Sequence, residues 1–142
     1  FRRVLFRSDA GTNVTIWVGL TDSVSTYPDG AAANALKFAG VRVAATGGSA
    51  NWKAVARDGT SESSQDLGVS GGSTWRTVGI QRTATGIQGF VGDHPVGAEV
   101  TTNIPALGAC YLVIGAYETS AAARVVSADF VRVTGEERRY DP

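Results

Sequence analysis

The sequence contains no methionine, one cysteine and one histidine among its 142 residues. Without methionine the chain has no translation start of its own, so we expect a processed product or a fragment of a longer protein. A single cysteine cannot form a disulfide within the chain. One histidine and one cysteine are also too few for the ligand set of a zinc site.

An excess of charge of one sign and long apolar runs are also absent. Lys and Arg together number 13, as do Asp and Glu, so the formal net charge is zero. This balance gives no electrostatic reason to expect nucleic acid or anionic lipid as a partner. No apolar run reaches the roughly 18 residues that a transmembrane helix needs, so membrane insertion is not expected.

Residues 1–8 differ from the rest of the chain. They read FRRVLFRS, which holds three arginines and no acidic residue. This string resembles the in-frame translation of a sequencing-library adapter, and no apolar stretch follows that would make it a signal peptide. We therefore interpret residues 1–8 as an adapter artefact outside the fold, and expect native N-terminal residues to be missing. Without these residues the chain has 10 basic against 13 acidic side chains.

The remaining chain has a hydrophobic period of two, which predicts an all-β domain over residues 9–134. Expected strands cover residues 14–20, 36–45, 51–57, 75–83, 87–91, 95–100, 111–117 and 124–133. The polar residues 60–73 are expected to form an exposed edge segment or a loop. Short strands at this spacing are typical of an antiparallel sandwich or barrel. Residues 135–142 are charged and aperiodic, which indicates a tail or a linker.

Three motifs in order carry a family resemblance. They are a Trp-basic-x-apolar-x-apolar strand at residues 75–80, an aromatic-apolar hairpin at residues 90–93, and an Asp-aromatic-Val-x-Val run at residues 129–133. Together they resemble the concanavalin A-like lectin/glucanase jelly roll, in the laminin-G-like variants common in phage virion proteins. The hairpin departs from the family, because Gly92-Asp93 reverses the usual Asp-Gly order. This departure weakens a ligand role for Asp93.

The resemblance covers residues 14–133 and implies an antiparallel two-sheet jelly-roll sandwich. The family's two sheets need more strands than this chain supplies, so we expect the N-terminal strands to be missing. Such a fragment would expose core-facing apolar side chains such as Ile16 and Val18, or leave unpaired strand edges. The resemblance also implies a location on a virion or a cell surface.

Catalytic groups are sparse in the sequence. Some relatives of the fold are glucanases with carboxylates alternating on one strand as Glu-x-Asp-x-x-Glu, and no such run is present. His94 follows Gly92-Asp93 in a turn, without a Gly-x-Ser-x-Gly nucleophile motif, so it is expected to be a solvated turn residue. We therefore expect no enzymatic activity. The alternative is a truncated glucanase-like hydrolase whose catalytic strand is missing.

Sugar recognition needs an exposed aromatic ring beside polar groups on a rigid surface. If the faces of the relevant strands coincide, a ligand-binding groove would be lined by Trp17, Arg42, Tyr111, Tyr117 and Asp129. The alternative is that these aromatic rings belong to the core or fill a second small cluster. Trp52 and Trp75 are assigned to packing, and Cys110 is expected to be a buried apolar residue.

Calcium is the one cofactor that the sequence suggests. Asp22, Asp29 and Asn34 lie in one expected loop, and calcium prefers oxygen ligands of this kind. Ordinary turn formation is the simpler interpretation, because no acidic repeat of defined spacing is present. The sequence thus favours a non-catalytic binding module of a virion or surface protein that recognises a surface glycan or polymer. The alternative is a purely structural module for oligomerisation or decoration, in contact with further copies or other virion proteins.

Overall fold

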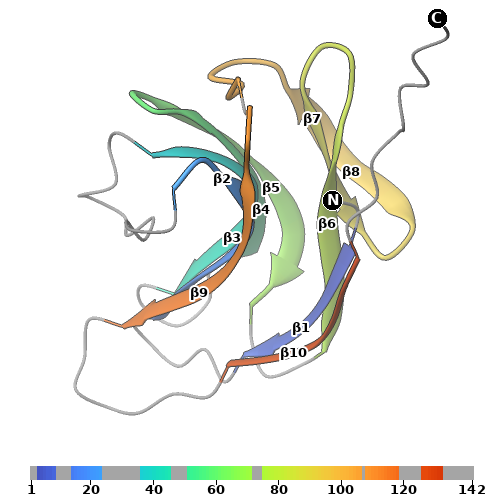
Figure 1. Cartoon of the computed structure of the whole chain (residues 1–142). Helices are drawn as coiled ribbons and strands as arrows, with labels where there is room; N and C mark the ends of the chain where they lie inside the picture. Colours follow the sequence, from blue (N-terminus) through green and yellow to red (C-terminus); the bar gives the residue numbers. More distant parts are fainter. Residues whose placement is uncertain are drawn as a thin grey trace, which may run out of the picture.

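The computed structural model describes residues 3–8, 14–23, 36–45, 51–71, 75–106, 108–118 and 126–132. All secondary structure in these ranges is β-strand (Figure 1). The strands are β1 (Arg3–Ser8), β2 (Val14–Thr21), β3 (Lys37–Ala45), β4 (Asn51–Asp58), β5 (Glu62–Ser70), β6 (Arg76–Arg82), β7 (Ile87–Val91), β8 (His94–Val100), β9 (Tyr111–Glu118) and β10 (Val126–Arg132).

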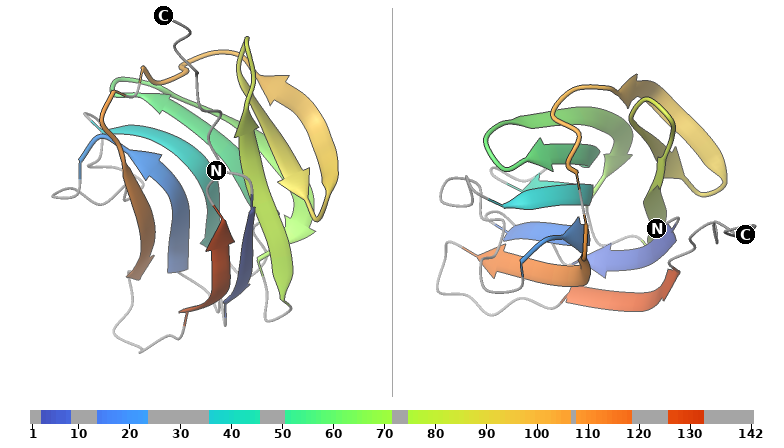
Figure 2. Two further views of the ribbon diagram at one scale, coloured as in Figure 1. Left: turned by 45° about the vertical axis from the view of Figure 1, so that its right-hand side comes forward. Right: turned by 45° about the horizontal axis from the view of Figure 1, so that its top comes forward.

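These strands form two antiparallel sheets of five strands each. The strand order is β10-β1-β6-β7-β8 in the first sheet and β5-β4-β3-β2-β9 in the second sheet. The sheets pack face to face, with β5 against β8 and β7, β4 against β7, and β3 against β6. Figure 2 shows the two layers from two further directions. The predicted fold class, an all-β two-sheet sandwich, is confirmed.

The described strands follow the predicted ones closely, because each alternates apolar and polar residues between two unlike faces. In β4, Trp52, Ala54 and Ala56 turn into the core, as the alternation predicts. Residues 60–73, expected as an edge segment or a loop, contain the edge strand β5. Leu67 is its buried apolar side chain.

Residues 3–8 take part in the fold, contrary to the expectation that residues 1–8 lie outside it. β1 lies between β10 and β6, with Val4 opposite Val131 on one side and Val78 on the other. A sheet forms through backbone hydrogen bonds, and Val, Leu and Phe favour the extended conformation. The segment therefore meets the physical requirements of a strand whatever its origin.

The core between the sheets is aliphatic, with Trp52 as its one large aromatic side chain among the described residues. Its fully buried members include Ile16, Val18, Val41, Val43 and Val78. Of the two outcomes expected for a fragment without its first strands, the exposure of Ile16 and Val18 is therefore wrong. Both side chains belong to the core cluster.

Candidate binding face

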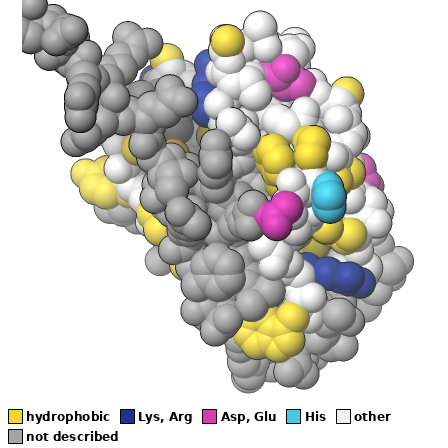
Figure 3. All heavy atoms as spheres, turned by 90° about the vertical axis from the view of Figure 1, so that its right-hand side faces the viewer, with side chains coloured by type: hydrophobic (Ala, Val, Ile, Leu, Met, Phe, Trp, Pro, Cys, Tyr) yellow, Lys and Arg dark blue, Asp and Glu magenta, His cyan; other side chains and the backbone are white. Residues whose placement is uncertain are grey.

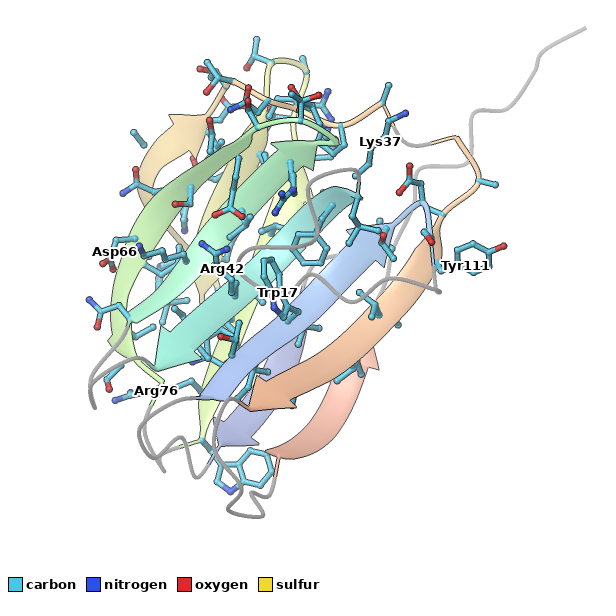
Figure 4. All side chains as sticks on the ribbon, turned by 90° about the vertical axis from the view of Figure 1, so that its left-hand side faces the viewer. Trp17, Lys37, Arg42, Asp66, Arg76 and Tyr111 are labelled. Carbon is cyan, nitrogen blue, oxygen red and sulfur yellow. The ribbon has the colours of Figure 1, made fainter. Side chains whose placement is uncertain are left out.

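The outer face is the side of the second sheet that points away from the sandwich core. The strand register aligns its residues in rows, so that Trp17 stands opposite Arg42, and Arg42 opposite Lys53. Figure 4 shows this face with Trp17 and Arg42 on neighbouring strands. The described side chains on the outer face include Thr15, Trp17, Thr21, Phe38, Arg42, Lys53, Val55, Arg57, Glu62, Ser64, Asp66, Tyr111 and Val113.

An aromatic cluster occupies the middle of the outer face. The rings of Trp17 and Phe38 meet edge to face, with centroids 5.0 Å apart and an interplanar angle of 88°. Val55 and Val113 complete the cluster. Only 1% of Trp17 is exposed, and its indole Nε1 has no hydrogen-bond partner. Trp17 is therefore a packing residue of a second, small apolar cluster.

Two glycines let Phe38 lie flat against the sheet. Gly19 and Gly40 stand opposite each other on β2 and β3. A Cβ atom added to Gly19 would lie 2.8 Å from Cζ of Phe38, and one added to Gly40 would lie 2.5 Å from it. The missing side chains therefore make the space that the Phe38 ring fills.

A charged network lies beside the aromatic cluster. The Arg42 guanidinium sits 4.7 Å from the centroid of the Trp17 ring, which is a cation–π contact. Its two terminal nitrogens donate to the two carboxylate oxygens of Glu62, at 2.8 and 2.5 Å. Nη1 of Arg57 lies 3.8 Å from the same carboxylate. The bidentate pair links β3 to β5 across β4, so Arg42 stabilises the sheet.

Tyr111 is the exposed aromatic residue of this face. It stands opposite Thr21 at the end of β2, and 51% of the residue is exposed. Figure 4 shows its ring projecting from the edge of the sheet. Asp22 follows Thr21 and is exposed, and its Oδ1 accepts the backbone N–H of Lys37 at 3.1 Å. An accessible ring and an exposed carboxylate thus lie at one end of the sheet.

The predicted five-residue groove does not form as expected. Trp17 is buried, so its ring cannot stack on a ligand. Asp129 lies on β10, which pairs with β1 in the first sheet, so it does not share a sheet with Arg42 or Tyr111. Tyr117 stands opposite Thr15 in β9, and its side chain is outside the described residues.

Three further predictions concern single residues. Trp75 was assigned to packing but is 42% exposed at the start of β6. Cys110 was expected to be buried but is exposed, because it precedes an edge strand. His94 is exposed as predicted, but it is the first residue of β8 and not part of the turn at residues 92–93, on the side of the molecule where Figure 3 shows apolar and charged side chains mixed.

Carboxylates of the described residues are held by separate donors. Oδ1 of Asp58 accepts the N–H groups of Thr60 and Ser61, both at 2.8 Å, and these bonds hold the pKa of the carboxyl below its usual 3.8. Asp66 accepts from Asn51 and from the Gly68 N–H. Glu99 accepts from the hydroxyls of Thr83 and Thr85.

The proposed calcium ligands can be followed only in part. Asp22 is described, whereas Asp29 and Asn34 lie outside the described residues. Within the described ranges, no three His, Cys, Asp or Glu side chains come together as a metal ion would require. Calcium binding therefore gains no support from the geometry.

Leu112 and Ile114 are a feature that the sequence did not reveal. They belong to the inward-facing set of β9 by alternation, yet 44% of Leu112 and 45% of Ile114 are exposed. Their apolar character suggests core residues, but among the described residues β9 packs closely only on β2, whereas the other edge strand, β5, is covered by β7 and β8. Consecutive apolar residues from 111 to 114, without strict alternation, are the one signal in the sequence.

The described part of the chain contains no helix that could span a membrane.

Comparisons with known proteins do not assign the chain to a family. No family model, no curated protein and no solved structure matches the chain.

Proposed function

We propose that this chain is a non-catalytic β-sandwich module that binds a surface glycan or a similar extended polymer through the Tyr111 end of the outer face. The observation that carries the proposal is the half-exposed Tyr111 ring at the end of the sheet where the exposed Asp22 follows β2. Tyrosine offers an apolar face for a sugar ring and a hydroxyl for hydrogen bonding. The Asp22 carboxylate at the same end can accept hydrogen bonds from sugar hydroxyls.

The carboxylates support a non-catalytic role. Retaining and inverting glycosidases need two carboxyl groups that face one substrate. Here Glu62 is engaged by Arg42, Asp66 by Asn51, and Glu99 by threonine hydroxyls. Each of these groups has a structural partner on the sheet or turn that it stabilises.

Binding at a flat sheet end would be weak for a single site. A shallow surface buries little of a ligand, so affinity depends on several sites acting together. The resemblance to laminin-G-like virion domains supports a module that is displayed in many copies on a virion or a cell surface. Avidity would then turn weak contacts into stable attachment.

A glycan array with the full chain displayed on multivalent beads tests the proposal. We expect hits that fall by about tenfold or more in Tyr111→Ala, because loss of ring contact costs roughly 1 kcal/mol per site and the loss multiplies with valency. His94→Ala, an exposed change on the other sheet, is the matched control and should keep the hits. Absence of any hit at high valency, or equal binding by Tyr111→Ala, would contradict the proposal.

A purely structural module is the second candidate, and the exposed apolar edge β9 favours it. An edge of this kind is suited to contact with another protein chain rather than with a sugar. Self-association without any glycan hit would support this second candidate over the first.

A further inference from the structure

The four sheet edges of the molecule are not alike. The edge strands are β10 and β8 in the first sheet, and β5 and β9 in the second. The pairing of β10 with β1, of β8 with β7 and of β5 with β4 is each interrupted by a register shift. The pairing of β9 with β2 runs without a shift from Tyr111 to Glu118. Bulges at edges discourage pairing with a further strand, and β9 has none.

Side chains reinforce this contrast between the edges. β5 contains Glu62 and Asp66, and Gly68 adopts a φ of 67°. β8 contains Pro95, which has no N–H to donate, and Gly97 with a φ of 69°. These are the devices by which natural sheets protect their edges.

β9 has none of these devices before its last residue, Glu118. Residues 111–117 include no charged residue and no proline. Large apolar side chains are accessible on both faces of the strand, with Tyr111 on the outer face, and Leu112 and Ile114 on the inner one. A straight, apolar and accessible edge is a template for one more strand.

The sequence of β9 is complementary to itself. In an antiparallel pair of two β9 strands centred on Ile114, every opposed residue from 111 to 117 is uncharged, and aromatic residues meet aromatic residues. The opposed pairs are Ile114 with Ile114, Val113 with Gly115, Leu112 with Ala116, and Tyr111 with Tyr117. Odd-numbered residues oppose odd-numbered ones and even-numbered residues oppose even-numbered ones. Side chains alternate between faces along a strand, so the outer faces of both copies lie on the same side of the joined sheet. Aromatic pairs and aliphatic pairs are favourable cross-strand neighbours.

We infer that two copies of this chain associate through antiparallel pairing of their β9 strands about Ile114. The second sheets of both copies then form one continuous sheet. A second copy fits better than a charged partner strand, because the edge offers apolar side chains and no ion-pair partner between residues 111 and 117. A formal net charge of zero also leaves no overall repulsion between copies.

Sedimentation of the full chain without any glycan tests the association. The unsubstituted protein is expected to show a concentration-dependent equilibrium between monomer and dimer. Ile114→Lys puts a charge at the centre of the edge and should weaken dimerisation by at least about tenfold. Ser64→Lys makes the same change at an exposed site of the opposite edge strand, β5, and should leave dimerisation unchanged. A monomer at every concentration, or equal weakening by both variants, would overturn the inference.

Cysteine cross-linking tests the register. In a Cys110→Ser background, Ile114→Cys puts two thiols directly opposite each other, at a Cα separation of about 4.5–5.5 Å that a disulfide spans. Mild oxidation should then give a covalent dimer. Ala116→Cys is the matched control, because its two copies would be about 13 Å apart and should remain reduced. Cross-linking of Ala116→Cys, or none in Ile114→Cys, would overturn the pairing about Ile114.

Tyr111 belongs to both the proposed glycan site and the inferred pair of β9 strands, so Tyr111→Ala alone does not separate the two. Dimerisation is therefore measured without ligand, and glycan binding is also measured with Ile114→Lys, which should weaken the dimer and keep the glycan hits at fixed bead valency. Loss of the dimer would leave the proposed glycan site in place, and absence of glycan hits would leave the dimer in place.

Discussion

At the scale of single residues, the outer face depends on two positions without a side chain. Gly19 and Gly40 form a strip of bare backbone, and the Phe38 ring lies on it at the edge of the Trp17 ring. The Phe38 ring can therefore pack on this face only because Gly19 and Gly40 have no side chains. The aromatic cluster would have to move if either glycine gained a Cβ atom.

Gly40→Ala is expected to destabilise the fold by about 1–3 kcal/mol, as overpacking does. The new Cβ would lie 2.3 Å from the carbonyl oxygen of Val18, which is part of the sheet and cannot rotate away. Gly108→Ala is the control, because a Cβ there meets no atom within 4 Å. Urea unfolding followed by tryptophan fluorescence measures both variants. Equal midpoints for the two would show that the strip is not needed.

A pH-dependent contribution is expected from Asp58. Its carboxylate accepts two backbone N–H groups in the turn between β4 and β5, and its pKa lies below 3.8 in the folded state. A lowered pKa means that the stabilisation is present above about pH 3.8 and is lost as the pH falls through the lower folded value. The thermal midpoint of Asp58→Ala should therefore lie below that of the unsubstituted protein near pH 6, and the gap should narrow toward pH 2.

Thr60→Ala provides the control for the Asp58 experiment. It leaves the carboxylate and both backbone donors in place, so its difference from the unsubstituted protein should not vary between pH 6 and pH 2. A gap for Asp58→Ala that stays constant with pH would contradict a role of the ionised carboxylate.

At the scale of elements, strand positions followed from alternation because each strand of the sandwich has one face in the core. Trp52 illustrates this, since its partners at two-residue spacing are all buried. Trp17 shows the limit of the same rule. Alternation correctly placed it off the core face, but could not show that Phe38 and Val113, from other strands, would cover it. Burial on that face depends on neighbours that only the sheet order brings together.

β1 shows a second limit of prediction from sequence, because a short extended segment can pair with any two strands whose facing edges are unpaired. Deleting residues 1–8 removes the described neighbour that joins β10 to β6. We expect a lower thermal midpoint and a less cooperative transition, since net hydrogen-bond contributions of about 1 kcal/mol each are lost along the strand. Deleting residues 1–2 alone should have little effect. An unchanged midpoint after the longer deletion would show that β1 adds nothing to stability.

At the scale of the whole molecule, packing is uneven between the two ends of the second sheet. Leu67 of β5 reaches across to β7, where its Cδ2 fills the space beside Gly89. At the other end, Leu112 of β9 is only partly covered. The candidate site and the inferred interface both belong to this less covered end. The sequence pointed to Tyr111 but not to the exposure of Leu112 and Ile114, because an inward-facing side chain at a sheet edge need not be buried.

This unevenness predicts two different responses to the same substitution. Leu67→Ala should cost about 2–5 kcal/mol of unfolding free energy, as expected for a buried leucine. Leu112→Ala should cost far less, because nearly half of that residue is already in contact with water. Urea unfolding at a protein concentration low enough to keep the chain monomeric makes the comparison. Similar losses for the two would contradict the uneven core.

The register shifts at β5, β8 and β10 also decide how large an assembly can become. Each β9 strand has a single free edge, and pairing with its own copy uses that edge in both partners. The other edges of the described sheets are irregular, so none of the described strands besides β9 offers a straight edge to a third copy. Such an isologous contact closes on itself as a cyclic pair, whereas a head-to-tail contact would propagate into a filament. The irregular edges of β5, β8 and β10 would therefore limit the assembly to two copies.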